Sequence, residues 1–293
     1  MKNKLKIIGI LIFAGFSFYY TDKVASIIKN NDPIMTEINS KKVDMIVSKI
    51  EPVLLEDEYL TGINGCIVDE KESYNKMKTI GHYNEDLFVM KEDEIKEELD
   101  KYIIGGNKEK RNVSIILINN SEVINNYVLK NNLKLDYFLD GEYIKDNAAK
   151  LIDISKNINI YNYGRNKNYT NKYLMYDNKV IKTNFNNTSD YCLVTKKEPD
   201  ILKTCTSNNM KVIKTEPIKN DILTYIKNNL FNGKIYLIDS DNYDEIKLSI
   251  KYILSKGYNI VHLDELLSTK KELSTLIISN IYKKEKYFKK SKV

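Results

Sequence analysis

Residues 112–141, NVSIILINNSEVINNYVLKNNLKLDYFLDG, constrain the fold most strongly because they predict a strand, a helix and a second strand in succession. Residues 113–118 are almost all apolar and rich in β-branched side chains, which is typical of a strand buried on both faces of a parallel sheet. Apolar residues at three- and four-residue spacing then indicate an amphipathic helix. The turn before it offers three capping side chains, Asn119, Asn120 and Ser121. In the second strand, apolar residues recur at every second position from Leu133 to Leu139.

The same order returns in residues 233–267, GKIYLIDSDNYDEIKLSIKYILSKGYNIVHLDELL. A strand is predicted at 235–238, and Ile246, Ile250 and Ile253 mark the buried face of the helix that follows. Gly257 lies where a helix ends in a left-handed residue, and a further strand is predicted at 258–261. Alternating strands and helices predict an α/β fold with a parallel sheet.

These segments together resemble the polysaccharide deacetylase family, whose NodB-like domain is a distorted (β/α) barrel. The resemblance covers residues 112–268. It rests on the order and spacing of four passages: FLDGEYI at 138–144, INIYNYG at 158–164, GKIYLI at 233–238 and GYNIVHLDELL at 257–267. The match therefore lies in the scaffold, and it implies an α/β barrel over residues 111–293.

The resemblance also implies where catalytic residues should lie, and the sequence lacks them. In active members an Asp pair supplies a general base and a metal ligand, two histidines complete the metal site, and a third histidine acts as general acid. The Asp pair falls on Ile118 and Asn119, the histidine pair on Tyr163 and Lys167, and the general acid on Asp239. A shift of one residue would place Asn119 and Asn120 in the Asp positions, which still supplies no carboxylate.

Other motifs do not replace this site. The Arg-Pro-type motif of the family falls on residues 191–194, YCLV, which lack it. The two histidines, His82 and His262, lie at no family position, so we predict structural roles for both. A rebuilt hydrolytic site would need carboxylates such as Asp140 and Glu142, which are also ordinary capping residues. We therefore predict no catalytic residues, no metal and no cofactor, with an active deacetylase kept as an alternative.

What remains at the expected mouth of the barrel is amide, carboxylate and aromatic chemistry suited to sugars, since rings offer apolar faces and amides both donate and accept hydrogen bonds. The candidate ligand-binding residues are Asn119, Asn120, Asp140, Tyr161, Tyr163 and Asp239. We predict an inactive deacetylase-like protein that binds a cell-wall or exopolysaccharide glycan. A cell-surface structural or interaction protein with a closed mouth is the alternative, and the sequence names no protein partner.

The first 25 residues predict a membrane anchor. Three lysines precede an uncharged, aromatic-rich run at 7–20, so the N-terminus should be cytoplasmic and the rest extracytoplasmic. A cleaved signal peptide, giving a secreted protein, is the alternative. Residues 26–110 predict a small α+β region, with a helix from Asp69 through Met77.

Charge and cysteine content narrow the function further. The net charge is +6, but the cations are scattered among 40 acidic residues without a nucleic-acid motif, so nucleic-acid binding is not expected. Cys66, Cys192 and Cys205 show no metal-binding or redox spacing. Buried free thiols are the favoured interpretation, and a Cys192–Cys205 disulfide in an exported protein is the alternative.

Overall fold

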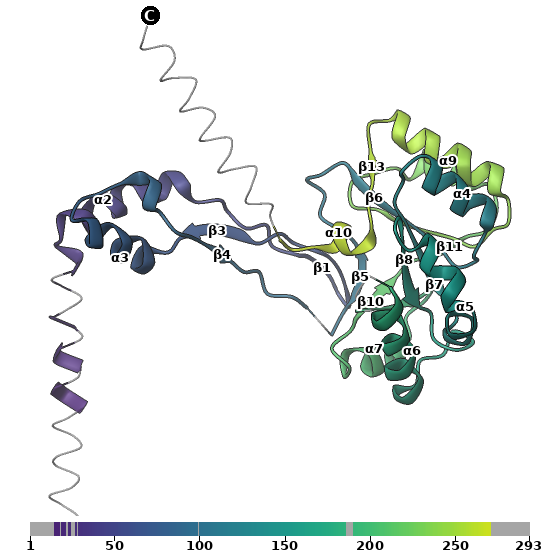
Figure 1. The fold of residues 1–293 in the computed structure, drawn as a ribbon, viewed down its shortest axis with the longest axis horizontal. Coiled ribbons are helices and arrows are strands. Elements are labelled where there is room, and N and C mark those ends of the chain that lie inside the picture. The colour runs from purple at the N-terminus through teal and green to yellow at the C-terminus, as the bar shows by residue number, and fades with distance from the viewer. Residues whose placement is uncertain are drawn as a thin grey trace, which may run out of the picture. The chain divides into compact units, whose positions relative to one another are not determined.

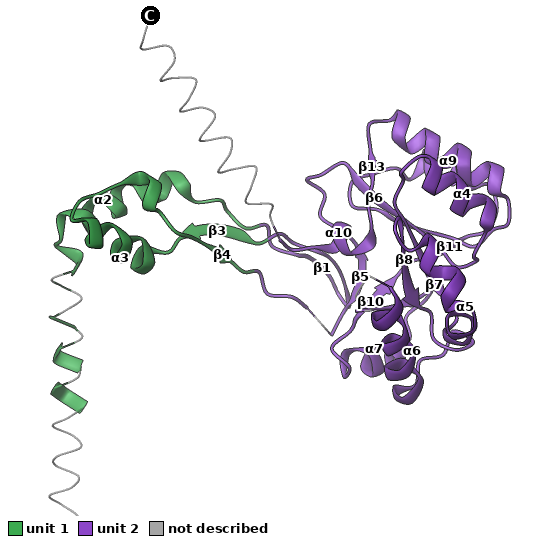
Figure 2. Ribbon diagram, in the orientation of Figure 1, with its two compact units in different colours: residues 1–49, 64–94, 271–293 green, residues 50–63, 95–270 purple. Residues whose placement is uncertain are grey.

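The computed structural model describes residues 15–17, 19–21, 23, 24, 27, 29–98, 100–185 and 190–270. It divides into two compact units, one made of residues 1–49, 64–94 and 271–293 and the other of 50–63 and 95–270 (Figure 2). Most of the predicted anchor at 7–20 lies outside the described residues. Within the described ranges, no helix is both long and apolar enough to cross a bilayer. The predicted boundary at residue 110 stays a prediction.

Unit 1 combines helices with a two-stranded sheet. Its elements are α2 (Pro33–Lys41), η1 (Lys42–Met45), β3 (Gly65–Val68), α3 (Glu70–Ile80), η2 (Glu85–Leu87) and β4 (Met90–Asp93). Asp32 and Asp69 cap α2 and α3 with their carboxylates, and Gly81 ends α3 in a left-handed conformation. The helix predicted from Asp69 is therefore present. Strands β3 and β4 are antiparallel, and Ile38 and Met77 are central to the small core.

Unit 2 contains two sheets. In the first the strand order is β1 (Val53–Leu55), β2 (Glu58–Leu60), β5 (Tyr102–Gly105), β10 (Lys211–Lys214), β9 (Tyr191–Val194). In the second it is β11 (Pro217–Ile218), β12 (Ile235–Ile238), β6 (Asn112–Leu117), β7 (Leu135–Leu139), β8 (Ile158–Asn162), and β13 (Asn259–Ile260) also pairs with β6. All pairs are parallel except β1–β2. The predicted parallel α/β sheet is confirmed.

Helices follow most strands of unit 2 (Figure 1). They are α4 (Glu122–Lys130), α5 (Gly141–Ile154), α6 (Asn171–Asn184), α7 (Pro199–Thr206), α8 (Ile222–Asn228), α9 (Tyr243–Ser255) and α10 (Leu263–Leu267). On β6, Val113 and Ile115 belong to the apolar layer beneath the helices, whereas Ile116 belongs to the core shared by the two sheets. Strand β6 is thus buried on both faces, as its composition predicts.

The predicted distorted (β/α) barrel is not confirmed. Strands from both sheets contribute side chains to one shared core, including Ile103, Ile116, Tyr161 and Val212. In the described part of the chain, however, no ladder joins β8 to β9, so the hydrogen-bonded strands do not form a continuous ring. The chain passes directly from β10 in one sheet to β11 in the other. The strand–helix periodicity predicts the elements but cannot reveal where a ladder is interrupted.

A disulfide joins Cys192 to Cys205, with the two Cα atoms 6.4 Å apart. The interpretation of these two cysteines as free thiols is therefore wrong, while Cys66 is free and buried. Cys192 lies on β9 and Cys205 near the end of α7, the helix that connects β9 to β10. Strands β9 and β10 are parallel neighbours, so the helix that connects them lies close to β9. This brings the two sulfur atoms together.

Candidate functional site

The carboxyl ends of the parallel strands β6, β7, β8 and β12 lie at one edge of the second sheet, which we call the mouth. Ligands of open α/β folds bind at this edge. Asn119 and Asn120 follow β6, Asp140 follows β7, Tyr163 follows β8 and Asp239 follows β12. The strand register thus places these five candidate residues after strand ends, as predicted. Whether they bind a ligand stays a prediction.

Asn120 lies in a network of amide and phenol groups beside the start of α4. Its Nδ2 donates to the hydroxyl of Tyr143 at 3.0 Å, and its Oδ1 accepts from Nδ2 of Asn125 at 2.8 Å. Ser121 caps the helix through its hydroxyl, which accepts from the backbone N–H of Ile124. Asn119 is exposed to solvent. Of the two predicted asparagines, one is engaged in the fold and the other faces solvent.

Asp140 links two parts of the mouth. One carboxylate oxygen caps α5 by accepting from the backbone N–H of Glu142 at 2.9 Å. The other accepts from the backbone N–H of Asn166 at 2.6 Å, in the loop that follows β8. Asn166 and Lys167 both have positive φ, so this loop has a tight, unusual course. Asp140 therefore holds the loop that carries Lys167, the position of an expected metal ligand.

The sequence analysis missed an ion pair that fixes the same loop. Arg165 donates to both carboxylate oxygens of buried Asp177, from Nη2 at 2.9 Å and from Nε at 3.2 Å, and its Nη1 reaches Glu142 at 3.0 Å. A bidentate guanidinium offsets the cost of burying a carboxylate away from water. A Cβ on Gly141 would lie 2.1 Å from Asp177 Oδ2, so only glycine fits there. The available signal was an aspartate that shares the buried helix face of Leu174 and Ile181, twelve positions after an arginine.

Aromatic side chains fill the interior below the mouth. The rings of Phe138 and Tyr161 are stacked with centroids 5.0 Å apart, and Tyr191 meets Tyr161 edge-on at 5.8 Å. Tyr161 is fully buried, so a ligand at the mouth does not reach it in this conformation. Tyr163 packs edge-on against Phe138 at 6.4 Å and is 6% exposed. These rings occupy the space below the strand ends.

The positions of the expected histidine pair are in contact with each other. The Lys167 ammonium lies 5.7 Å from the centroid of the Tyr163 ring, which is cation–π distance. Burial raises the pKa of Tyr163 to about 12, and the negative charges of Asp239 and Glu198 add to that shift. Tyr163 is therefore a neutral phenol at physiological pH. A neutral phenol and an ammonium are poor ligands for a divalent metal.

Asp239, at the position of the expected general acid, is half-buried at the end of β12. Its backbone N–H donates to the carbonyl of Ile218 on β11, which continues the ladder between these strands. Across the described residues, no three His, Cys, Asp or Glu side chains are grouped so that they could hold a metal ion. The donor set at the mouth therefore does not fit the metal that the deacetylase mechanism requires.

A second polar cluster lies at the opposite, amino-terminal end of the strands. Asp136 is fully buried and accepts from Ser114 Oγ at 2.9 Å and from the backbone N–H of Leu263 at 2.7 Å. Nδ1 of His262 lies 3.0 Å from its other oxygen. Burial raises the pKa of Asp136, against the lowering effect of these three partners. Because Ser114 bonds to the carboxylate and not to the histidine, the cluster is not a nucleophilic triad. It ties β6 and β7 to the start of α10.

Comparisons with known proteins bear on the fold. No family model matches the sequence, and no curated protein matches it. Among solved structures, BA3943 of Bacillus anthracis, a CE4 family pseudoenzyme, matches with a TM-score of 0.57 and 18% identity, over 82% of this chain and 97% of that chain. The chain has the fold of the CE4 polysaccharide deacetylases. A BA3943 mutant, described as a pseudoenzyme with restored enzymatic activity, matches with the same TM-score and identity and is covered completely.

The resemblance to deacetylases assigns the expected catalytic positions to residues at and near the mouth. In this chain the deacetylase scaffold is present, whereas the positions that should carry metal and acid–base groups carry Ile118, Asn119, Tyr163, Lys167 and Asp239. The predicted resemblance to the polysaccharide deacetylase family is confirmed for the fold.

Proposed function

We propose that this chain is a membrane-anchored, extracytoplasmic protein that has the CE4 deacetylase fold without deacetylase activity, and that it acts by binding. The observation that carries the proposal is the Tyr163–Lys167 contact at the expected metal position. A metal there would require the ammonium to leave the ring and would then face its positive charge. The positions expected to hold the Asp pair and the general-acid histidine carry Ile118, Asn119 and Asp239 instead.

The disulfide supports the extracytoplasmic part of this proposal. Disulfides persist in oxidising compartments and are rare in the cytosol, where thiols are kept reduced. Cys192 and Cys205 are paired and both are fully buried. A domain with a buried disulfide fits an exported protein. The charged tip and apolar run before residue 21 supply the proposed anchor.

We further propose that a cell-wall glycan binds at the rim of the mouth, where the interior is closed by aromatic rings. The rim offers exposed Asn119 and the Asn120–Tyr143 pair, in which the Tyr143 side chain is 40% exposed. An exposed phenol ring beside two amides can take the apolar face and the hydroxyl groups of a sugar. Asp140 and Asp239 flank the rim as further acceptors.

A second candidate is the closed-mouth interaction protein, whose partner is another protein. The stacked pair of Phe138 and Tyr161 favours it, because these rings fill the space that a sugar would enter in an open groove. The two candidates differ in one requirement. Only the glycan binder needs the rim side chains to contact a saccharide.

The test combines sedimentation with peptidoglycan and acetate release from an N-acetylglucosamine oligomer, using the full chain in detergent. We expect no acetate release and expect co-sedimentation that Tyr143→Ala weakens severalfold. Tyr176→Ala is the matched control, because Tyr176 is an exposed tyrosine on α6. Co-sedimentation that is absent, or equal in both variants, would favour the interaction protein. Acetate release would show that the chain is an active deacetylase.

A further inference from the structure

A groove separate from the mouth lies along α6. Its volume is about 410 Å³, within the range of about 300–1,000 Å³ typical of small-molecule sites. One wall is a single face of α6, and the other contains Asp190, Asn208 and Met210. Asp190 directly precedes β9 and Met210 directly precedes β10, so the groove opens at the amino ends of these strands. None of the candidate residues of the mouth lines the groove, so the groove is a distinct surface.

The floor of the groove is apolar and is held in place by the core. Leu174 and Met210 are both buried, and Met175 on the same helix is exposed. The amide of Asn178 donates from Nδ2 to the sulfur of Met210 at 3.2 Å, which bridges the two walls. The backbone N–H of Met210 donates to the carbonyl of Cys205, a member of the disulfide. The second wall is thereby fastened to β9.

The rim of the groove is cationic. Lys179 and Lys182 line it one helical turn apart, with the hydroxyl-bearing Thr183 beside them. The only acidic residue of α6 is Asp177, which is buried and paired with Arg165. The Nζ of Lys182 lies 3.7 Å from Oδ1 of Asp190, and both side chains are about half exposed. An exposed pair of this kind contributes only about 0–1 kcal/mol, so Lys182 can exchange Asp190 for another anion.

We infer that this groove binds an acidic oligosaccharide. The two lysines face its anionic groups, and the Oδ1 of Asn208 and the hydroxyl oxygen of Thr183 face its hydroxyls as acceptors. The exposed side chain of Met175 contacts the apolar face of a ring, above the buried Leu174 and Met210. The anionic group is a carboxylate or a phosphate, which present the same charge-assisted acceptors to lysine. The site does not depend on the rim of the mouth.

Binding to the full chain in detergent, measured by calorimetry, tests the inference. The probes are tetragalacturonate, which carries carboxylates, a phosphomannan fragment, which carries phosphate, and neutral maltotetraose. We expect at least one acidic probe to bind, with affinity that falls as salt rises, and maltotetraose to bind at least tenfold more weakly. The stronger acidic probe identifies the source of the charge.

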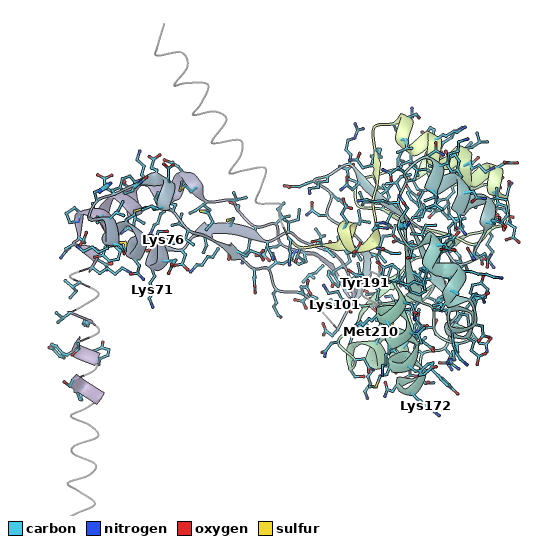
Figure 3. All side chains as sticks on the ribbon, viewed as in Figure 1. Lys71, Lys76, Lys101, Lys172, Tyr191 and Met210 are labelled. Atoms are coloured by element: carbon cyan, nitrogen blue, oxygen red, sulfur yellow. A yellow bond between two sulfur atoms is a disulfide. The ribbon has the colours of Figure 1, made fainter. Side chains whose placement is uncertain are left out.

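Three charge variants locate the site. We expect Lys179→Glu with Lys182→Glu to weaken binding of the acidic probe at least tenfold, and Asp190→Asn to tighten it about threefold by releasing Lys182. Lys172→Glu is the matched control, because Lys172 is on α6 but outside the groove and away from Met210 (Figure 3). Circular dichroism checks that each variant is folded.

The inference is overturned if neither acidic probe binds, if the double variant binds like the wild type, or if Lys172→Glu reduces binding as much as the double variant does. The last result would mean that general positive charge, and not the groove, attracts the ligand. Tyr143→Ala separates this site from the proposed rim site. It should leave binding of the acidic probe unchanged, and loss of that binding would assign the ligand to the mouth.

Discussion

At the scale of single residues, the buried Asp177 connects several elements near the mouth. Asp177 is held by two hydrogen bonds from Arg165, and its carboxylate occupies the space where a Cβ on residue 141 would be. The fit of Gly141 therefore depends on the Arg165–Asp177 pair. The same arginine reaches Glu142, so α5, α6 and the loop after β8 meet at one guanidinium.

We predict that Gly141→Ala lowers the free energy of unfolding by about 2 kcal/mol, because the added methyl group must displace Asp177 from Arg165. Urea unfolding measures the change. The control is the same substitution in an Asp177→Ala background, where the obstruction is absent and alanine should be neutral or stabilising at the first turn of α5. An equal loss in both backgrounds would show that Asp177 is not the cause.

The sequence revealed which residues lie at the strand ends but not which of them face outward. Asn119, Asp140, Tyr163 and Asp239 could be placed because each follows a predicted strand. The burial of Tyr161 could not, since strand alternation assigns a side chain to a face and does not say how far the core extends. The Arg165–Asp177 pair was missed because a loop residue and a helical residue meet only in the folded chain.

At the scale of secondary structure elements, the strand–helix–strand units were predictable because hydrophobic periodicity records them directly. The interruption between β8 and β9 was not, because it depends on which strands pair, and short parallel strands carry no pairing signal in their composition. The sequence also left undecided whether Cys192 and Cys205 form a disulfide. These cysteines are 13 positions apart in the sequence, and this spacing permits either a bond or two free thiols.

We predict that removing this disulfide, by Cys192→Ala with Cys205→Ala, lowers the free energy of unfolding by about 3 kcal/mol, because the bond closes a short loop in the unfolded chain. A reductant should destabilise the wild type and leave the double variant unchanged. Thiol titration in denaturant should find one reactive thiol, Cys66, before reduction and three afterwards. Three thiols without reduction would contradict the pairing.

At the scale of the whole molecule, the chain joins a small α+β unit to a CE4-fold unit, and the two keep separate cores. The CE4 fold was identified from four short passages, although identity to BA3943 is only 18%. These four passages are constrained by packing and turn geometry, which any chain with this fold must keep. The catalytic positions record chemistry, which the proposed binding function would not require.

We propose that the deacetylase scaffold persists here without its metal centre. The most direct test is metal content by mass spectrometry on the full chain, purified in detergent without chelator and then challenged with zinc, cobalt and nickel. We predict no metal above background after buffer exchange, because Tyr163 and Lys167 replace the ligands and no alternative group of ligands is present in the described ranges. A stoichiometric, tightly held ion would contradict the claim and restore hydrolysis as the function.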